Sequence, residues 1–563
     1  MHPAAMLAPM KAPHLPPALE TALHRLRAGA QNVISRLPGE RPRWVVLELS
    51  GAIVARLRRP RILGVPVPPA LVGGSHSLEE IAATLAVLGR ADWLEGVAFR
   101  IDGLSTDSAT AYGLRRAISK LRQAGKKTLA YLPRVDLTAH YVASAAEEIV
   151  CPESADFFLH GLGISVTFYR DALARFGIRF EKLAIDEYKN AFDTLVRQEM
   201  SPAQREQLEA LLTSFEAHYM DEIASGRGIS ANDVRASVDV GITSAAQAKE
   251  RKLIDRIAYE DEVFGKAHRS LEDARRFVRV PFPPPGSKRI AVVSLTGPIV
   301  SGRSRGAPVP VPPFGGGVSG SDTVVSALRI AGADPSTAAV VFHVDSGGGS
   351  ALASDLIWRE VQRVRAKKPV VGVMGAVAAS GGYYVLASAT RIVAAPTTIT
   401  GSIGVLTGKP VLEGMFEKFG LHAEQIRRGK TALLFHPVKA WDEDARALVG
   451  RHNAEVYERF LLRVAEGRGK TRDDVHALAR GRIYSGVDAK EKGLVDELGD
   501  LRRAIDIARD LSSAGPDAPA WSVAPPHELL LPSAEDPTTL ARLYGDLLRE
   551  TSLCMMPSSL RVS

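Results

Sequence analysis

The chain of 563 residues has a formal net charge of +8 and a sequence pI near 9.3, with 45% hydrophobic and 24% charged residues. This composition is typical of a globular protein and excludes a chain dominated by disorder. Aromatic residues make up only 6% and no motif that reads RNA or DNA occurs, so we expect no nucleic-acid partner. An anionic membrane surface is the favoured partner for the basic charge.

The first segment, residues 1–43, is expected to lie outside the folded domains. Met1 to Pro17 is rich in proline and too short of apolar residues to be a signal peptide or a spanning helix. From Leu19 to Leu37, apolar residues recur at helical spacing, with arginines elsewhere around the helix. Two interpretations stay open: docking on a membrane surface, or packing against the protein body.

The chain contains an internal repeat. At a shift of 243 residues, Phe99 and Asp102 fall on Phe342 and Asp345, and the strand-like run 44–54 falls close to the run 290–300. A period this long indicates a duplicated domain rather than a solenoid, because each copy of roughly 210 residues can bury its own core.

The repeat predicts the domain organisation. Each copy is expected to be an α/β domain, and the stretch between them contains the proline-rich run Pro281–Pro285. We expect the last part of the C-terminal tail, which is rich in proline and serine, to be poorly ordered. The predicted parts are the N-terminal segment 1–43, the first repeat 44–260, a linker 261–287, the second repeat 288–501, and a helix with tail 502–563.

Strands and helices are predicted to alternate within each copy. In the second copy, the apolar run Ala338–Val344 predicts a strand, Ser354–Arg365 a helix and Val370–Met374 the next strand. This order favours a mostly parallel sheet with helices on its faces. Ala203–Ile223 and Asp442–Val464 are predicted to be long helices that close the two copies.

Two glycine-containing motifs that follow predicted strands, Asp345–Ser350 and Ala378–Tyr384, are the candidates for chemistry. Ser380 is expected to begin a helix, where the backbone N–H of Gly381 can donate to a developing oxyanion. The turn Gly347–Gly349 lets the backbone approach a substrate carbonyl and can supply a second N–H donor. Such glycine loops are usually plain turns, and a serine at a helix start is often only an N-cap.

The repeat tests these alternatives internally. The constant shift places Leu137 opposite Ser380, and Gly103–Ser105 opposite Ser346–Gly348. The first copy has therefore lost the serine and the glycine loop together. If both served folding alone, the first copy would need them too, so we interpret Ser380 as a nucleophile.

A serine nucleophile needs a base, and no histidine lies between His343 and His422. His343 itself lies in a predicted strand and is expected to be a core or edge residue. The alternative base is a lysine whose pKa is lowered by burial. Lys189 is the best candidate, although a lysine in such a charged stretch, taken by itself, is normally a solvated surface residue.

Three motifs together resemble the signal peptide peptidase A (protease IV) family in its long, duplicated form. They are Ala378–Tyr384, Thr400–Gly404, and Tyr188–Ala191 followed by Glu199–Pro202, and the resemblance covers about residues 44–505. It implies two tandem α/β domains of the crotonase/Clp-protease-like type. It also implies a serine peptidase with a Ser/Lys dyad.

The resemblance assigns roles to individual residues. Ser380 matches the nucleophile, Lys189 matches the general base, and Ser402 is implied to orient the lysine. The implied donors to the oxyanion are the backbone N–H groups of Gly381 and of Gly348 or Gly349. No cofactor and no metal are implied. Cys151 and Cys554 are read as structural thiols, since they have no metal-ligand spacing and give no disulfide framework.

This sequence departs from the family pattern in its oxyanion loop and at its N-terminal end, and it offers a rival base. Gly347 stands where the family has proline in its oxyanion loop, and Asp345 stands where it has asparagine. Lys430 lies two positions from Ala432, the register equivalent of Lys189, and is a rival base within the second copy. We also expect no counterpart here of the N-terminal membrane anchor of the bacterial enzymes, since no stretch near the start of this sequence is apolar enough.

The expected function is a serine endopeptidase that degrades cleaved signal peptides and other unfolded apolar peptides at the membrane. Association with the inner, cytoplasmic membrane is expected to be peripheral, on a side that the sequence does not decide. The resemblance implies a homotetramer, and the dyad can form within one chain or across subunits. Two alternatives remain: a catalytically silent oligomeric scaffold of the same fold, and crotonase-like acyl-CoA thioester chemistry.

Overall fold

In a computed structural model the chain forms two compact units, each assembled from separate stretches of sequence. Unit 1 comprises Met1–Gly161, Tyr219–Arg289 and Ala514–Ser533, and unit 2 comprises Leu162–His218, Ile290–Ser513 and Ala534–Ser563. The structure describes residues 40–56, 76–265, 286–305, 317–523 and 553–555, together with single residues and short stretches in 26–35, 61–66 and 268–279.

Unit 1 is built on a parallel sheet with the strand order β11-β8-β6-β5-β1-β12, in which β4 also pairs with β1. The strands are β1 (Trp44–Val54), β4 (His76–Ser77), β5 (Gly96–Ser105), β6 (Lys127–Tyr131), β8 (Glu148–Cys151), β11 (Arg256–Ile257) and β12 (His268–Ser270). Val97 and Phe99 of β5 point to one face and Ala98 to the other, and all three are completely buried, as expected for a parallel sheet covered on both faces.

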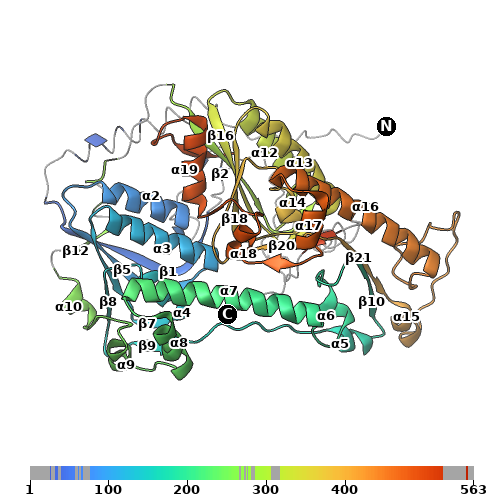
Figure 1. Ribbon diagram of the computed structural model, residues 1–563, viewed down its shortest axis with the longest axis horizontal. Helices are drawn as coiled ribbons and strands as arrows, with labels where there is room; N and C mark the ends of the chain where they lie inside the picture. Colours follow the sequence, from blue (N-terminus) through green and yellow to red (C-terminus); the bar gives the residue numbers. More distant parts are fainter. Residues whose placement is uncertain are drawn as a thin grey trace, which may run out of the picture. The chain divides into compact units, whose positions relative to one another are not determined.

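Helices and two short strand pairs complete unit 1, and α2 and α3 pack side by side (Figure 1). The helices are α2 (Leu78–Gly89), α3 (Ser108–Gln123), α4 (Leu137–Ala143), α8 (Ala231–Val240), α9 (Ala245–Glu250) and α10 (Glu260–Val263). The strand pairs are β2 (Arg61–Ile62) with β3 (Val65–Pro66), and β7 (Arg134–Asp136) with β9 (Asp156–Phe158).

The central sheet of unit 2 has the strand order β22-β20-β18-β16-β13, and β19 and β23 extend it from β18. Its strands are β13 (Arg289–Thr296), β16 (Thr337–Ser346), β18 (Val370–Ala379), β19 (Arg391–Ala394), β20 (Ile399–Gly401), β22 (Ile483–Tyr484) and β23 (Glu497–Leu498). The pairs of β18 with β16, β19 and β20 are parallel, whereas β20 pairs antiparallel with β22.

A second sheet of unit 2 has the order β10-β21-β25-β17-β14-β15. Its strands are β10 (Arg179–Ala184), β14 (Ile299–Val300), β15 (Ser319–Gly320), β17 (Gly348–Ser350), β21 (Leu406–Val411) and β25 (Leu553–Met555). β10 lies in the predicted first repeat, yet it pairs antiparallel with β21 of the second. This ladder brings the segment that carries Lys189 into unit 2.

Helices α12, α13 and α14 of unit 2 lie together beside β16 and β18 (Figure 1). The helices of this unit are α5 (Arg170–Ala174), α6 (Asp193–Val196), α12 (Ser321–Ala333), α13 (Ala351–Arg365), α14 (Gly381–Tyr384), α15 (Glu413–Lys418), α16 (Glu443–Arg468), α17 (Arg472–Leu478), α18 (Gly486–Glu491) and α19 (Leu501–Ser512). The helix α7 (Pro202–Arg227) contributes its residues up to His218.

The sequence of α13 shows why a helix forms directly after the glycine loop. The side chain of Ser350 accepts a hydrogen bond from the backbone N–H of Ala353, so it caps the first turn. Ile357, Val361 and Val364 then recur at helical spacing and are buried. The glycine loop is thereby fixed between a buried strand and a capped helix.

The strands and helices predicted within the second repeat, and the two long closing helices, are confirmed, and three stretches differ from expectation. The strand predicted at Val370–Met374 continues to Ala379, so it ends directly before Ser380. β12 lies inside the predicted linker and pairs with β1. The prediction of a poorly ordered tail end was wrong for Leu553–Met555, because the open edges of β17 and β21 provide partners for a third strand.

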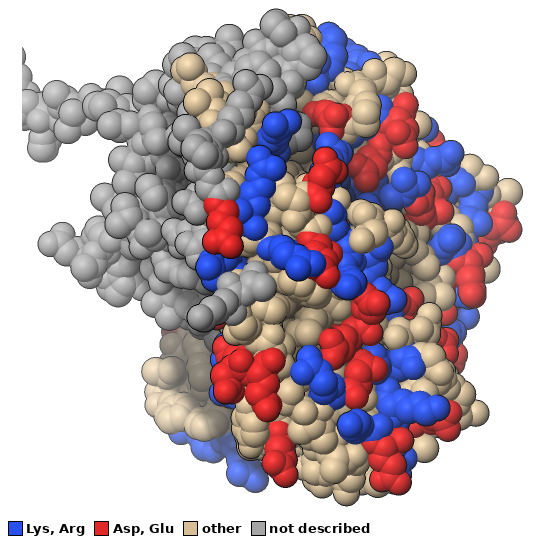
Figure 2. All heavy atoms as spheres, turned by 90° about the vertical axis from the view of Figure 1, so that its left-hand side faces the viewer, with Lys and Arg blue, Asp and Glu red and all other residues tan. Residues whose placement is uncertain are grey.

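Two features of the sequence led us to expect a membrane contact: the amphipathic N-terminal segment and the net positive charge. The amphipathic stretch Leu19–Leu37 lies almost entirely outside the described residues. Within the part of the chain that the structure describes, no helix combines the length and apolarity needed to cross a bilayer. On the face drawn in Figure 2, basic and acidic side chains are interspersed, so the net charge is not gathered into a basic patch there.

Candidate active site

Ser380 lies at a sharp turn between β18 and α14. Its backbone has φ 55° and ψ −115°, a strained conformation for a residue that has a Cβ atom. The side chain is completely buried and makes no capping hydrogen bond to α14. The plain N-cap interpretation is therefore wrong, since strain without a cap does not stabilise the helix.

Lys189 reaches Ser380 from the loop between β10 and α6. Its Nζ atom lies 2.7 Å from Oγ of Ser380, 2.8 Å from the carbonyl oxygen of Ser402 and 3.0 Å from Oγ of Ser402. Lys189 is buried, with an exposed fraction of 1%. The structure thus brings the three residues singled out from the sequence together within one chain.

Backbone hydrogen bonds position Ser402 next to Ser380. Ser402 follows β20, whose Gly401 is the register partner of Ala379, and the carbonyl of Gly401 accepts a hydrogen bond of 2.8 Å from the N–H of Ser380. The N–H of Ser402 donates to the carbonyl of Arg482 at 2.7 Å. The backbone positions of Ser380 and Ser402 are therefore fixed relative to each other.

The Lys189 loop is anchored by buried polar groups. The amine of Lys182 donates to the carbonyl of Lys189 at 2.7 Å and forms an ion pair with Asp193. Burial lowers the pKa of Lys182, although the Asp193 carboxylate opposes the shift. Asn190 donates to the same carboxylate at 2.8 Å. These contacts fix the backbone from which the Lys189 side chain projects.

Gly481 packs closely against the backbone of the loop that carries Lys189. It has φ +85°, and a Cβ atom built on it would lie 2.5 Å from the backbone nitrogen of Lys189. Only a glycine allows this approach. The loop before β22 therefore sets where Lys189 can lie.

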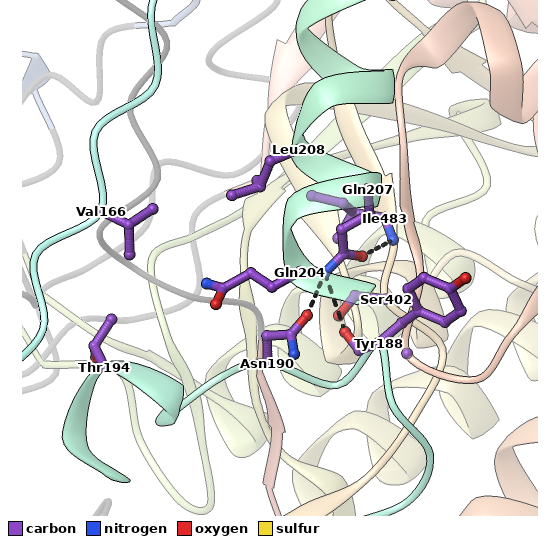
Figure 3. Close-up of a pocket in the computed structure, with 10 residues that line it drawn as sticks. Val166, Tyr188, Asn190, Thr194, Gln204, Gln207, Leu208, Ser402 and Ile483 are labelled. Carbon is purple, nitrogen blue, oxygen red and sulfur yellow. Dashed lines mark hydrogen bonds between the residues drawn. The ribbon is translucent and has the colours of Figure 1, made fainter. Parts of the chain in front are cut away.

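Two glutamines of α7 lie beside a small cavity of about 20 Å³ next to Ser402 (Figure 3). Gln207 donates to the side chain of Asn190 at 2.5 Å and to the carbonyl of Tyr188 at 3.3 Å, and its oxygen accepts from the N–H of Ile483 at 3.1 Å. Gln207 thus links the Lys189 loop to β22.

Gln204 differs from its neighbour on the same helix. Its side chain is buried and extends toward Val166 and Thr194 (Figure 3). Its Oε1 atom has no hydrogen-bond partner among the described residues. A cavity of this size holds about one water molecule, which can satisfy that atom.

The glycine loop lies against the start of α14. Gly348 and Gly349 have φ of 102° and 157°, and a Cβ atom on Gly349 would lie 2.0 Å from the carbonyl oxygen of Ile299. A Cβ atom on Gly382 would lie 2.3 Å from the carbonyl oxygen of Ser346, so the loop touches α14. In this structure the N–H of Gly348 donates to Oγ of Ser346 at 3.1 Å.

The rival residues lie in other settings. Lys430 is exposed in the segment between α15 and α16, whereas Ser380 is buried. His343 is buried within β16, in agreement with its interpretation as a core residue. Oδ1 of Asp345, which replaces the family's asparagine, accepts a hydrogen bond of 3.1 Å from the N–H of Val377. In unit 1, Leu137 occupies the first position of α4 and is buried.

Sequence reasoning singled out Ser380, Lys189 and Ser402, which the structure brings together, but it missed the residues that support them. No sequence motif marks these supporting residues, because each contacts either a residue distant in sequence or a backbone group. They are Gly481, Gln207 and Lys182. Gly481, two residues before the short strand β22, is the one local signal, since a glycine at this place indicates a tight turn.

Two regions of the chain match one known family. The model of "Peptidase family S49" matches residues 120–274 and again residues 362–514. The chain belongs to peptidase family S49. The two matched regions confirm the duplicated α/β fold of this S49 chain.

Curated S49 relatives align with most of the chain. "Serine protease SPPA, chloroplastic" from Arabidopsis thaliana is 32% identical over 74% of this chain and 63% of its own length. "Protease 4" from Salmonella typhi is 30% identical over 70% of this chain and 66% of its own length. The chain therefore spans slightly less than two thirds of the length of these relatives.

Solved structures give weaker likenesses. A single-residue mutant of the "1510-N membrane-bound stomatin-specific protease" has a TM-score of 0.27 at 15% identity, covering 42% of this chain and 99% of its own. A single-residue mutant of ClpP1 from Listeria monocytogenes has a TM-score of 0.24 at 16% identity, covering 38% of this chain and 94% of its own. At these TM-scores neither structure bears on the site.

Proposed function

We propose that the chain is a serine endopeptidase in which Ser380 is the nucleophile and Lys189 is the general base. The observation that carries the proposal is the 2.7 Å hydrogen bond between the buried Lys189 amine and the Ser380 hydroxyl. Membership in peptidase family S49, and relatives named as proteases, support the reaction class. The strained turn at Ser380 supports a role beyond folding, because strain of this kind concentrates at functional sites.

The first step is attack on the substrate. Lys189 must act as the free amine, and burial among neutral oxygens supports this form because it disfavours a charged ammonium. The amine takes the Ser380 proton while Oγ forms a bond to the peptide carbonyl carbon. Backbone N–H groups of Gly381 and of Gly348 or Gly349 would hold the resulting oxyanion.

The second step releases the acyl group. The ammonium of Lys189 returns its proton to the departing amine, and the peptide C–N bond breaks to leave an ester on Ser380. The free amine then takes a proton from water, whose oxygen attacks the ester carbonyl. The bond between Oγ and the acyl carbon breaks, the ammonium returns its proton to Oγ of Ser380, and the carboxylic acid product leaves. The two hydrogen bonds that the amine donates to Ser402 orient it in both steps.

The substrates that we propose are cleaved signal peptides and other unfolded apolar peptides at a membrane. The family resemblance of the motifs around Ser380, Lys189 and Ser402 supports this substrate class. We also propose peripheral membrane contact through the segment before residue 40, and a homotetramer. Vesicle binding with and without residues 1–40, and the mass of the protein in solution, test these two points separately.

The test of the reaction is cleavage of an apolar signal-like peptide by the purified chain. Ser380→Ala and Lys189→Ala are expected to abolish turnover, each with an unchanged circular dichroism spectrum, while Ser402→Ala leaves slow turnover. Because the dyad forms within one chain, a mixture of the two inactive variants should stay inactive. Recovery in the mixture would place the dyad across subunits instead.

Three other results would overturn the proposal. Equal peptide cleavage by the parent chain and both single variants would exclude this site. No cleavage by the assembled parent chain would favour the silent scaffold. Hydrolysis of an acyl-CoA thioester without peptide cleavage would favour crotonase-like chemistry, for which the same glycine loop would hold the thioester oxyanion.

A further inference from the structure

The C-terminal strand β25 lies between the two strands that border the candidate site. It pairs antiparallel with β17, in the register Gly348↔Met555 and Gly349↔Cys554. On its other edge, Leu553 pairs antiparallel with Leu406 of β21. β25 therefore joins two parts of the second sheet, β10-β21 and β17-β14-β15, that have no direct strand pairing in the sheet order.

The strand lies beside the groups that a peptide attacked by Ser380 would contact. β17 contains Gly348 and Gly349, the proposed oxyanion donors, and β25 also contacts α14, the helix that begins directly after Ser380. An extended peptide that adds to an open sheet edge gains its affinity from backbone hydrogen bonds. Here it would gain them from strands on both sides.

One side chain of the strand is seated in an apolar site. Met555 is 8% exposed and packs in a cluster with Ala191, Val300, Val318 and Leu406. Ala191 is two residues from Lys189, so this cluster lies next to the base in the sequence. An apolar residue at the same register of a bound peptide would fill the same space, which is the specificity that alternate side chains provide in strand addition.

We propose that the segment Leu553–Met555 is a built-in occupant of the peptide-binding groove and competes there with substrate. The inference rests on the proposed peptidase function, and it defines how that function recognises substrate: as an antiparallel strand between β17 and β21, with an apolar side chain in the Met555 site. The strand must leave before a substrate can bind.

Competition within one chain is strong even when the strand binds weakly. A binding segment that belongs to the same chain as its groove has an effective concentration on the order of 1 mM. A segment with an intrinsic dissociation constant of about 0.1 mM would then fill the groove roughly 90% of the time and raise the apparent KM about tenfold. Expelling the strand should therefore lower KM and leave kcat unchanged.

The experiment uses the full chain with two substitutions at one position. Met555→Asp places a charge in the apolar cluster and is expected to expel β25, whereas Met555→Leu keeps the apolar contact and serves as the matched control. We expect Met555→Asp to lower KM for a short apolar peptide about tenfold at constant kcat. Met555→Leu should keep the KM of the parent chain.

A binding measurement separates this inference from the proposed function. A fluorescent peptide with the sequence of residues 550–558 is titrated, by anisotropy, into Ser380→Ala protein with and without the Met555→Asp substitution. The peptide should bind the Met555→Asp protein about tenfold more tightly, and the same peptide carrying Met555→Asp should not bind. This measurement needs no catalysis.

The outcomes distinguish the two claims. If peptides are cleaved but Met555→Asp changes neither KM nor peptide binding, β25 is a structural strand and the inference is overturned, whatever the change in melting temperature. If the labelled peptide binds as expected while no variant cleaves any peptide, the groove occupancy stands and the peptidase proposal fails.

Discussion

The Nζ atom of Lys189 lies 2.7 Å from Oγ of Ser380, although the two residues are 191 positions apart in the chain. The ladder between β10 and β21 makes this contact possible within one molecule, because it carries the Lys189 loop to the strand that follows Ser402. The alternative of a dyad that forms only across subunits is thus unnecessary for the geometry. Substitutions around this pair should change activity and stability in different ways.

Gly481→Ala should displace Lys189. The new Cβ atom would lie 2.5 Å from the backbone nitrogen of Lys189 and 2.7 Å from its Cα atom, so the loop must move. A displacement of about 1 Å near the reacting atoms lowers kcat on the order of 100-fold. Gly429→Ala is the control. Gly429 has φ +89° and no atom within 4 Å of a Cβ built on it, so alanine there has the strain of a positive φ without a steric clash. Equal kcat in both variants would contradict the prediction.

Replacing Ser380 should separate stability from activity. Alanine and glycine both remove the hydroxyl, but only glycine relieves the strain of φ 55° and ψ −115°. We expect Ser380→Gly to have a free energy of unfolding about 1 kcal/mol higher than Ser380→Ala, while both are inactive. Thermal melts in parallel measure the difference. A less stable glycine variant would show that the turn is not strained.

Gln207→Leu should destabilise unit 2 more than Gln204→Leu. The first change leaves the N–H of Ile483 and the side-chain oxygen of Asn190 without this partner, at about 2–4 kcal/mol for two buried polar groups. In the second change the lost Oε1 atom has no partner among the described residues, so we expect less than about 1 kcal/mol. Urea denaturation of both variants gives the comparison, and a reversed order would refute it.

Acid should destabilise unit 1 through His140. Burial lowers the pKa of His140 to about 4, although its hydrogen bond to the carbonyl of Leu253 opposes the shift. The unfolded chain, with a pKa near 6.5, then binds a proton that the folded unit excludes, so stability falls as pH drops from about 6.5 to about 4. The loss is about 3 kcal/mol for this group.

Thermal unfolding of His140→Gln across the same pH range checks this prediction. The variant should lose less stability in acid than the parent chain, because glutamine does not titrate. His160→Gln, a change at an exposed position of the same unit, should keep the pH dependence of the parent. An unchanged slope in His140→Gln would assign the acid effect to other groups.

Local patterns in the sequence predicted the elements well. Apolar runs and helical spacing located β16, α13 and β18, because these signals depend on neighbouring residues. The comparison of the two repeat copies singled out Ser380. Lys189 and Ser402 came from the family resemblance, since a lysine in a charged loop has no local signature of burial. The structure gave what depends on distant residues: the φ of Ser380, the contact of Gly481 and the place of Leu553–Met555.

The pairing of β10 with β21 has a consequence for how the protein is made. During synthesis, the segment with Lys189 leaves the ribosome long before its partner strand, which follows roughly 220 residues later, so β10 exposes an unpaired edge in the meantime. Contacts this far apart also close slowly. We therefore expect peptidase activity to appear late in refolding, after most of the helical signal, and to be the property most sensitive to chaperones that shield exposed strands.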